Sequence, residues 1–250
     1  MTSIPTADAP MDGDLPTLRG KKGLPYNDPT YLDLIEGRGV SWVYNWKALP
    51  DATLPRGIEY VPMCWGPASA ELCVQDIQAA LASGSTHALS FNEPDHHQQA
   101  NMTPETAAAL HMEIFDAIST AVKIGSPAVT NGAAPMGISW LDSFLNLCVN
   151  RCRIDFVTYH WYGATHSLDD LQSHTQAVVE LAARYNISKV WLTEFGTHSG
   201  NFGEGDFLKG ALNVLNTSPS VERYAYFMLA ERILLSANRL NELGEIYVGV

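Results

Sequence analysis

Short apolar runs alternate along this chain with longer segments in which apolar residues recur at the spacing of a helix. The short runs are rich in β-branched and aromatic residues and stop at polar residues, Gly or Pro, which is typical of buried strands. They predict eight strands, at residues 22–26, 40–46, 58–65, 88–92, 123–128, 155–162, 189–195 and 223–228. The longer segments predict helices at residues 70–83, 104–121, 139–150, 168–185, 205–215 and 240–247.

The order of these elements predicts the fold. Repetition of strand and then helix predicts a parallel sheet, and eight such strands favour a single (β/α)8 TIM barrel of the α/β class, with its active site at the carboxyl ends of the strands. The first two connections, residues 27–39 and 47–57, are short for full helices. We therefore expect one domain over residues 21–250 that is irregular on that side, after a flexible tail at residues 1–20.

Composition narrows the classes of partner. The chain has 250 residues, of which 46% are hydrophobic, enough for one well-filled core. Its formal net charge of −12 disfavours nucleic acid and anionic membrane surfaces, because both are polyanions. No apolar stretch approaches the roughly 18 to 20 residues of a membrane span. We expect a soluble monomer that binds neither nucleic acid nor membrane.

Two features bear on the compartment. The first 20 residues contain no apolar signal-peptide core, so we expect no secretory leader in the chain as given. In a secreted protein, processing removes such a leader. Three N-glycosylation sequons begin at Asn101, Asn186 and Asn216, in predicted loops or helix ends. The sequons favour a secreted protein, either extracellular or in a cell wall.

The four cysteines leave their state open. The spacing of Cys64 and Cys73, and of Cys148 and Cys152, is compatible both with disulfides and with small buried thiols. These pairs lack the C-x-x-C spacing and have no His at ligand spacing beside them, which argues against zinc.

Two glutamates stand where a predicted strand meets a loop. Glu93 ends the run His87-Ala-Leu-Ser-Phe-Asn-Glu-Pro94, and Glu194 lies near the end of Lys189-Val-Trp-Leu-Thr-Glu-Phe-Gly196. Glu is rarely buried unless it is paired or functional, although a surface or capping carboxylate is the ordinary alternative. Two carboxylates in one cleft are the working groups of a glycosidase.

A set of motifs appears in order along almost the whole chain after the tail. They are Lys21-Lys-Gly-Leu-Pro-Tyr-Asn27, Val40-Ser-Trp-Val-Tyr-Asn-Trp46, Tyr60-Val-Pro-Met-Cys-Trp65, Phe91-Asn-Glu-Pro94, Asp155-Phe-Val-Thr-Tyr-His-Trp-Tyr-Gly163 and Trp191-Leu-Thr-Glu-Phe-Gly196. In this order they resemble glycoside hydrolase family 128, the β-1,3-glucanases, within a large clan of retaining barrel glycosidases. The resemblance implies a catalytic domain that acts on β-1,3-glucan or laminari-oligosaccharides, without metal or organic cofactor.

The resemblance also implies roles for the two glutamates. Glu93, on the fourth strand, would be the acid/base, and Glu194, on the seventh, the nucleophile. A retaining mechanism needs the two carboxyl groups about 5 to 5.5 Å apart, and an inverting one more than about 6.5 Å. We expect burial or the charge of Glu194 to keep Glu93 protonated.

Other residues near the predicted strand ends are candidates for sugar binding. Asn92 can reach a sugar hydroxyl or stabilise the turn before Pro94, and His160 shares a strand face with Tyr162 but can equally be a structural histidine. Aromatic rings stack on the apolar faces of sugars, whereas Trp42 and Trp191 are expected to pack between barrel and helices. The candidates for substrate contact are Asn92, Tyr44, Asn45, Trp46, Trp65, Asn131, Trp140, His160, Trp161, Tyr162 and Phe202, with Trp140 equally suited to capping a helix.

One departure from the clan pattern concerns strand eight. Many members have a Trp at its end, whereas residues 223–229 contain none, and Tyr226 or Met228 is expected in its place. Two alternatives to β-1,3-glucan hydrolysis remain open: hydrolysis of another β-glycan, such as mixed-linkage glucan or mannan, and a non-catalytic glucan-binding protein on the same barrel. The sequence does not decide between endo and exo action.

Overall fold

The computed structural model describes residues 20–197 and 203–249. Strands β1 to β8 occur in the predicted order. They are β1 (Lys22–Pro25), β2 (Trp42–Tyr44), β3 (Glu59–Tyr60), β4 (His87–Ala88), β5 (Lys123–Ile124), β6 (Val157–Gly163), β7 (Val190–Thr197) and β8 (Val221–Tyr226). The α-helices are α1 (Ala70–Ala82), α2 (Pro104–Phe115), α3 (Gly137–Cys148), α4 (Leu168–Arg184), α5 (Glu204–Thr217) and α6 (Glu242–Gly249).

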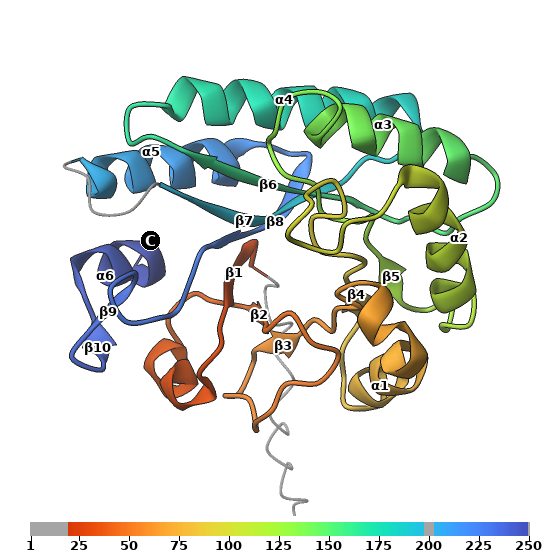
Figure 1. Ribbon diagram of the computed structural model, residues 1–250. Helices are drawn as coiled ribbons and strands as arrows, with labels where there is room; N and C mark the ends of the chain where they lie inside the picture. Colours follow the sequence, from red (N-terminus) through yellow and green to blue (C-terminus); the bar gives the residue numbers. More distant parts are fainter. Residues whose placement is uncertain (1–19, 198–202, 250) are drawn as a thin grey trace, which may run out of the picture.

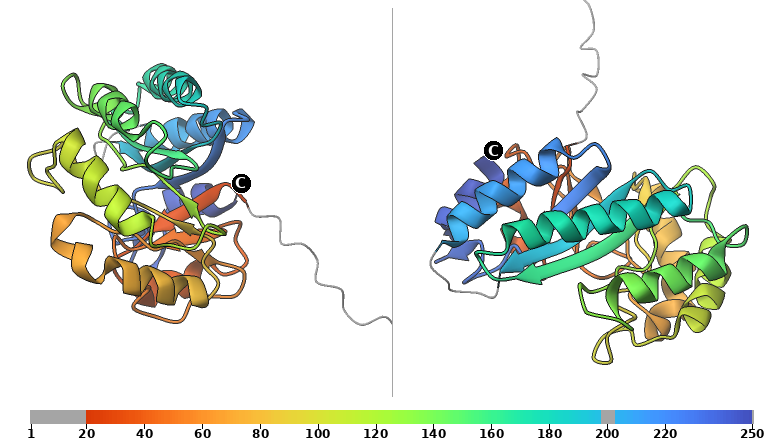
Figure 2. Two further views of the ribbon diagram at one scale, coloured as in Figure 1. Left: turned by 90° about the vertical axis from the view of Figure 1, so that its right-hand side faces the viewer. Right: turned by 90° about the horizontal axis from the view of Figure 1, so that it is seen from above.

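The strands form a parallel inner layer inside a ring of helices (Figure 1). Six of them pair in the order β3-β2-β1-β8-β7-β6, and β4 pairs with β5. These ladders do not close the ring, but single parallel bridges link the two groups on both sides, Met63 with Leu89 and Gly125 with Phe156. Helices α4 and α5 lie side by side outside β6 to β8 (Figures 1 and 2). The fold is therefore the predicted α/β barrel.

The predicted irregularity on the side of the first two connections is confirmed. The first connection contains a 3-10 helix, η1 (Pro29–Ile35), and residues 47–57 contain no helix. A second 3-10 helix, η2 (Pro67–Ser69), precedes α1, and a small hairpin of β9 (Leu235–Ser236) and β10 (Arg239–Leu240), which was not predicted, precedes α6.

Helix α2 ends earlier than predicted, at Phe115 instead of residue 121. The guanidinium of Arg153 donates to the carbonyl oxygens of Ile118 and Ser119, at 2.8 and 2.9 Å. These bonds satisfy carbonyls in a segment of turns that leads into β5, so a side chain distant in sequence provides hydrogen bonds that a longer helix would have made itself. Helical periodicity in the sequence could not reveal this contact.

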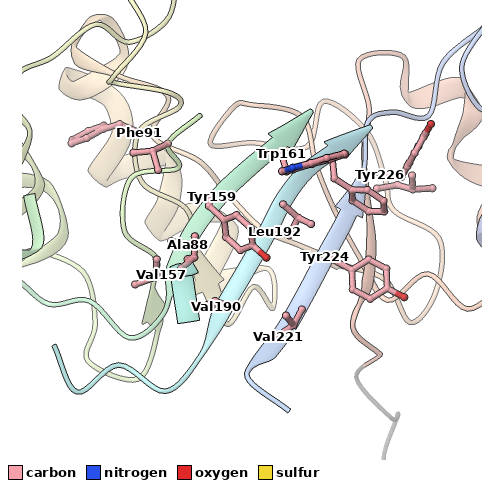
Figure 3. Packing of buried hydrophobic residues seen from close by; sticks show 14 of the residues in the cluster. Ala88, Phe91, Val157, Tyr159, Trp161, Val190, Leu192, Val221, Tyr224 and Tyr226 are labelled. Atoms are coloured by element: carbon pink, nitrogen blue, oxygen red, sulfur yellow. The ribbon is translucent and has the colours of Figure 1, made fainter. Parts of the chain in front are cut away.

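The hydrophobic residues form two layers. Between strands and helices, alternate residues of β6, Val157, Tyr159 and Trp161, point to one side (Figure 3). A second cluster contains only residues of strands and their extensions, including Trp42, Phe156 and Trp191, with the last two rings stacked 4.1 Å apart. Trp42 and Trp191 thus fill the interior of the barrel, and the expectation that they pack against helices is wrong.

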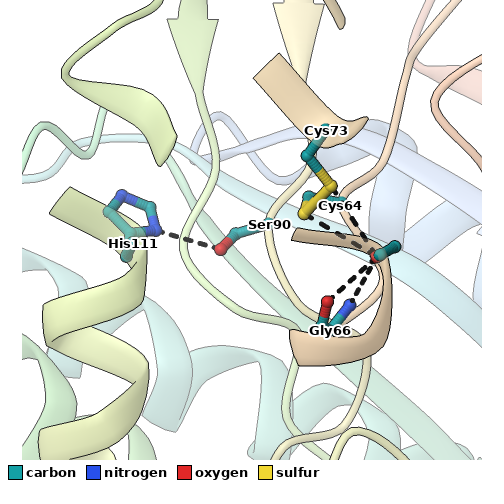
Figure 4. The surroundings of a disulfide bond; sticks show 6 residues. Cys64, Gly66, Cys73, Ser90 and His111 are labelled. Carbon is teal, nitrogen blue, oxygen red and sulfur yellow. Dashed lines mark hydrogen bonds between the residues drawn. A yellow bond between two sulfur atoms is a disulfide. The ribbon is translucent and has the colours of Figure 1, made fainter. Parts of the chain in front are cut away.

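All four cysteines are paired. Cys64 and Cys73 join the end of the β3 segment to α1, with Ser69 of η2 beside both sulfurs (Figure 4). Cys148 and Cys152 close a short loop at the end of α3. The structure therefore resolves the choice that the sequence left open in favour of disulfides. Among the described residues, no helix has the length and apolar character needed to cross a membrane.

Candidate active site

Glu93 lies in a tight turn at the carboxyl end of the β4 segment. Its φ of +41° is uncommon for a residue other than glycine. The backbone N–H of Glu93 donates to the carbonyl oxygen of Ala128, at 2.7 Å. The neighbouring Asp95 carboxylate accepts from the backbone N–H groups of Thr130 and Gly137, at 3.2 and 2.8 Å. The turn that presents Glu93 is thus fixed against the loop that follows β5.

Glu194 lies inside β7, where its register partner on β6 is His160. It is 5% exposed, and both of its carboxylate oxygens accept hydrogen bonds. Trp46 donates its indole N–H to Oε1 at 2.8 Å, and Tyr162 donates its hydroxyl to Oε2 at 2.6 Å. The hydroxyl of Tyr44 lies 3.3 Å from Oε1 and 3.0 Å from the carbonyl oxygen of Thr193. These donors orient the carboxylate and stabilise its negative charge.

His160 connects the two glutamates. Its Nδ1 lies 2.8 Å from Oε1 of Glu93, and its Nε2 lies 3.0 Å from the hydroxyl of Thr193 and 3.6 Å from Oε1 of Glu194. The side chain is fully buried. A single imidazole therefore bridges both carboxyl groups and can share a proton with Glu93.

The electrostatics of this pair are coupled. Burial alone would raise the pKa of Glu93, but the hydrogen bond and positive charge of His160, together with the charge of His96, hold that pKa below its usual value. Burial alone would lower the pKa of His160, whereas the charges of Glu194, Glu93 and Asp95 raise it. The expectation that Glu93 has a raised pKa is thus wrong for the free protein, because the proton of the pair favours His160.

The glutamates open into a cavity of about 560 Å³. Its walls combine aromatic rings with amides and the two carboxyl groups, a mixture that suits a polyhydroxylated ligand with apolar faces. The lining residues are Asn27, Trp46, Trp65, Asn92, Glu93, Gln99, Tyr162, Glu194 and Phe227.

Several residues that the sequence singled out meet at this cavity. Asn92, Trp46, Trp65 and Tyr162 line it with the two glutamates. Asn92 donates to Gln99 at 3.3 Å, while its buried Oδ1 has no hydrogen-bond partner among the described residues. Asn92, next to Glu93, thus lines the cavity and has an acceptor that the described residues leave without a hydrogen bond.

Four candidates lie behind the cavity wall. Tyr44 and His160 contact the glutamates without lining the cavity. Asn45 organises the turn after β2, accepting from Tyr60 at 2.5 Å. Asn131 exchanges hydrogen bonds with the backbone of Tyr162, at 3.0 and 3.3 Å. Tyr44, His160 and Asn131 thus contact residues of the cavity lining, whereas the partners of Asn45 lie outside it.

Three candidates are not brought to the cavity. Trp161 points toward the helices, where it stacks on Phe207 and donates to Asp170 at 2.9 Å. Strand alternation requires this, because Trp161 shares the outer face with Tyr159 (Figure 3). Trp140 stacks on Phe144 within α3 and donates to a backbone carbonyl, so it packs between helices. Phe202 lies outside the described residues.

Sequence reasoning missed Asn27, Gln99 and Phe227. Phe227 follows β8 and contacts both Trp46 and Tyr162 edge to face, with ring centroids 5.7 Å apart in each pair. It occupies the cavity position expected for Tyr226 or Met228. Tyr226 points outward and donates to Glu204, at 2.8 Å. Alternation from the inward-facing Ala225 would have identified Phe227.

Glu93, His160 and Glu194 together have the composition of a metal site. The described residues include Glu93, His160 and Glu194, whose ligand atoms lie within 4.8 Å of one another. These groups already bond to each other, to Tyr162 and to Trp46. That hydrogen bonding accounts for the cluster without an ion, and the absence of a metal from the reaction stays a prediction.

Comparison with known proteins identifies the family. The family described as glycosyl hydrolase catalytic core matches residues 23–247, so the chain belongs to that class of enzymes. The chain is 39% identical to a glycoside hydrolase family 128 (subgroup III) enzyme from Blastomyces gilchristii, covering 92% of this chain and 98% of that one with a TM-score of 0.88. The chain is therefore a member of glycoside hydrolase family 128.

Two further relatives extend the comparison. A subgroup I enzyme from Amycolatopsis mediterranei is 34% identical, with 91% of this chain and 98% of that chain covered and a TM-score of 0.76. Alkali-sensitive linkage protein 1 of Schizosaccharomyces pombe is 30% identical over an alignment 256 residues long, which covers 93% of this chain. That match covers 45% of the yeast protein, so the chain spans about half the length of this curated relative.

Proposed function

We propose that the protein is a retaining glycoside hydrolase that cleaves β-1,3-glucan, with Glu93 as acid/base and Glu194 as nucleophile. The observation that supports the mechanism best is the spacing of the two carboxyl groups, which have oxygens within 4.8 Å of each other at one cavity. This short distance between carboxylate oxygens fits the close spacing of a retaining enzyme better than the wider spacing that an inverting enzyme needs for its water molecule.

The reaction proceeds in two displacements. Glu194 attacks the anomeric carbon as the glycosidic bond breaks, while the Glu93–His160 pair delivers a proton through Glu93 to the departing oxygen. Water then attacks the glycosyl–Glu194 ester; Glu93 accepts the proton of this water, and the Glu194 carboxylate leaves. Tyr162 and Trp46 stabilise the charge that returns to Glu194.

The bridging histidine links the two displacements. The negative charge of Glu194 is the largest favourable influence that raises the pKa of His160. Formation of the ester removes this charge, so the Glu93–His160 pair binds its proton less tightly as the leaving group requires one. When the ester is hydrolysed the charge returns, and the pair regains its affinity for the proton taken from water.

The substrate assignment is supported by chemistry and by the relatives. The rings of Trp46, Trp65 and Phe227 offer surfaces to the apolar faces of sugar units, and the amide residues Asn27, Asn92 and Gln99 add polar groups for hydroxyls. The Blastomyces gilchristii enzyme is described as a curdlan-specific exo-β-1,3-glucanase bound to glucose, and the Amycolatopsis mediterranei enzyme as an endo-β-1,3-glucanase bound to laminaripentaose.

We further propose that the protein acts from chain ends. Its likeness to the exo enzyme, at a TM-score of 0.88, exceeds its likeness to the endo enzyme, at 0.76. An exo enzyme releases short products while the viscosity of the polymer falls slowly; a rapid early fall in viscosity would contradict this assignment.

The central experiment uses Glu194→Ala with a panel of curdlan, laminarin, mixed-linkage glucan and mannan. We expect the wild-type protein to cleave the β-1,3-linked glucans with net retention at the anomeric carbon, observed by NMR. The variant should lose turnover by roughly a thousandfold or more while binding laminari-oligosaccharides. Turnover near the wild-type level in the variant would exclude the mechanism, and cleavage of mannan alone would overturn the substrate class.

Binding of glucan without release of products by the wild-type protein would instead establish a glucan-binding protein.

We also propose a monomer, because the large hydrophobic side chains exposed in the described part of the chain are limited to Leu49, Leu72 and Val149. Size-exclusion chromatography coupled to light scattering tests this.

Secretion, to the medium or the cell wall, is a further part of the proposal. Two disulfides favour an oxidising compartment. All three sequon residues are exposed. Asn101 and Asn186 lie at positions of positive φ, 45° and 61°, and Asn216 accepts a hydrogen bond from Tyr224 at 2.8 Å. We expect the native protein to lose mass on enzymatic deglycosylation and the Asn186→Gln variant to lose less. Recovery of the native protein from the cytosol would contradict the localisation.

A further inference from the structure

A groove of about 400 Å³ adjoins the catalytic cavity and shares Trp46 with it. One wall is the segment after β2, and the other is η2 with the first turns of α1. The ring of Trp46 is a boundary common to both hollows, while its indole N–H is fixed on Glu194. Trp46 therefore lies where the two hollows meet.

The groove exposes apolar side chains from both walls. Leu49 is 39% exposed on one wall and Leu72 is 60% exposed on the other. They are two of the three large hydrophobic residues that are exposed in the described part of the chain. Apolar side chains that are gathered in one groove, with polar residues around them, are typical of a ligand-binding surface.

Both walls are built rigidly. Asn45 donates to the carbonyl oxygen of Leu49 at 3.2 Å, and Lys47 pairs with Asp51 at 2.6 Å, so hydrogen bonds fix the first wall. The disulfide between Cys64 and Cys73 fixes the second wall (Figure 4). A preformed surface loses little conformational entropy on binding.

The polar groups indicate the chemical class of the occupant. Asp51, Glu71 and Asp76 contribute carboxylates to the lining, whereas the one cationic side chain there, Lys47, is paired with Asp51. Carboxylates accept hydrogen bonds from hydroxyl groups and repel anionic ligands. Leucine side chains pack on the C–H faces of sugars. An uncharged, polyhydroxylated chain with apolar faces satisfies all of these groups.

We propose that this groove is an accessory glucan-binding site, which holds sugar units of the same chain whose scissile bond lies at Glu93 and Glu194. The proposal rests on the proposed function and deepens it. Binding of these units stabilises complexes of long chains and leaves short oligosaccharides, which fill only the catalytic cavity, unaffected. Affinity for substrate therefore rises with chain length.

The experiment compares Leu49→Ser, Leu72→Ser and the double variant with the wild-type protein. Both residues are exposed, so the fold should tolerate the changes. We expect KM for soluble long-chain β-1,3-glucan to rise about three- to tenfold in the double variant, with kcat unchanged, since each leucine loses a partly buried apolar contact. KM for laminaribiose or laminaritriose should stay within twofold of wild type, a margin we choose as the criterion of no change.

Val149→Ser is the matched control. Val149 is 49% exposed near the disulfide at the end of α3 and is distant in sequence from the groove residues. Its replacement should leave KM unchanged for both long and short substrates. Binding to the inactive Glu194→Ala protein provides an independent readout: adding the two Leu→Ser changes should lower its affinity for laminarihexaose by a similar factor. An unchanged KM for long-chain β-1,3-glucan in the double variant of an active enzyme would overturn the groove, whereas no cleavage of any β-1,3-glucan by wild type would overturn the proposed function.

Discussion

The two ends of the barrel both hold a buried glutamate beside a histidine, yet their chemistry differs. At the amino end of the strands, Glu59 of β3 pairs with Arg223 of β8 at 2.6 Å and lies 3.1 Å from Nδ1 of His87. The guanidinium lies over the rings of Trp42 and Trp191, at 5.8 and 4.5 Å from their centroids. At the carboxyl end, two glutamates share His160 and open into a cavity.

The difference lies in charge balance and access. Burial acts to raise the pKa of Glu59, but the hydrogen bond to His87 and the charge of Arg223 lower it far below its usual value. Glu59 thus stays ionised and stabilises the fold. At the other end, two carboxyl groups share a histidine, and within the described part of the chain neither pairs with an arginine, so that protons can move when one charge changes. A buried glutamate becomes reactive through incomplete neutralisation and contact with a cavity.

The largest expected effect concerns Glu93, at the carboxyl end of the strands. Glu93→Ala should lower kcat on β-1,3-glucan by about 10²- to 10⁴-fold, because no group then protonates the leaving oxygen. A dinitrophenyl β-glucoside, whose leaving group needs no proton, should show a much smaller loss in formation of the glycosyl-enzyme. Added azide needs no general base and can attack the glycosyl-enzyme in place of water, so it should accelerate turnover of this substrate by the variant. Equal losses on both substrates would contradict the role of Glu93 as acid.

At the amino end of the strands, where Arg223 neutralises Glu59, the expected effect is on stability. Glu59→Gln leaves the Arg223 charge buried without its carboxylate and should lower the free energy of unfolding by about 3–5 kcal/mol in urea titrations. The kcat of the folded variant should match wild type. A stability loss under about 1 kcal/mol, or a fall in kcat comparable to that of Glu93→Ala, would remove the distinction between the two ends.

Tyr162→Phe sharpens the comparison further. The variant removes the hydrogen bond of 2.6 Å to Oε2 of Glu194 and keeps the aromatic ring in the cavity. A hydrogen bond to a charged group contributes about 1.5–3 kcal/mol, so we expect kcat to fall roughly tenfold to a hundredfold. Tyr159→Phe, on the outer face of the same strand, is the matched control and should leave kcat unchanged. Loss of activity in both variants would indicate a general distortion of β6.

The smallest expected effect is a change in the pH profile with His160→Gln. In the wild-type protein the pKa of His160 is raised above 6.5, so the Glu93–His160 pair loses its proton only as the pH rises through this higher value. Without the imidazole, Glu93 holds that proton alone. The alkaline limb of kcat/KM should therefore move to lower pH, by at least about one unit. An unchanged limb would show that His160 does not share the proton.

The order of the elements and the two candidate catalytic glutamates could be predicted from the sequence. Strand periodicity and breakers located the ends of β4 and β7, and the ordered motifs indicated the family. The faces of strands were also available in the sequence. Trp161 shares the face of Tyr159, and Phe227 the face of Ala225, so strict alternation would have corrected both assignments.

The contacts between distant side chains and the shape of the cavity could not be predicted from local sequence patterns. The bridge from Glu93 through His160 to Glu194 joins three strands, and the groove joins the segment after β2 to α1. The turn bearing Gln99 and the end of α2 likewise depend on contacts distant in sequence. Local periodicity records which face a side chain takes, whereas pKa values and cavities depend on distances across the barrel, which no single segment encodes.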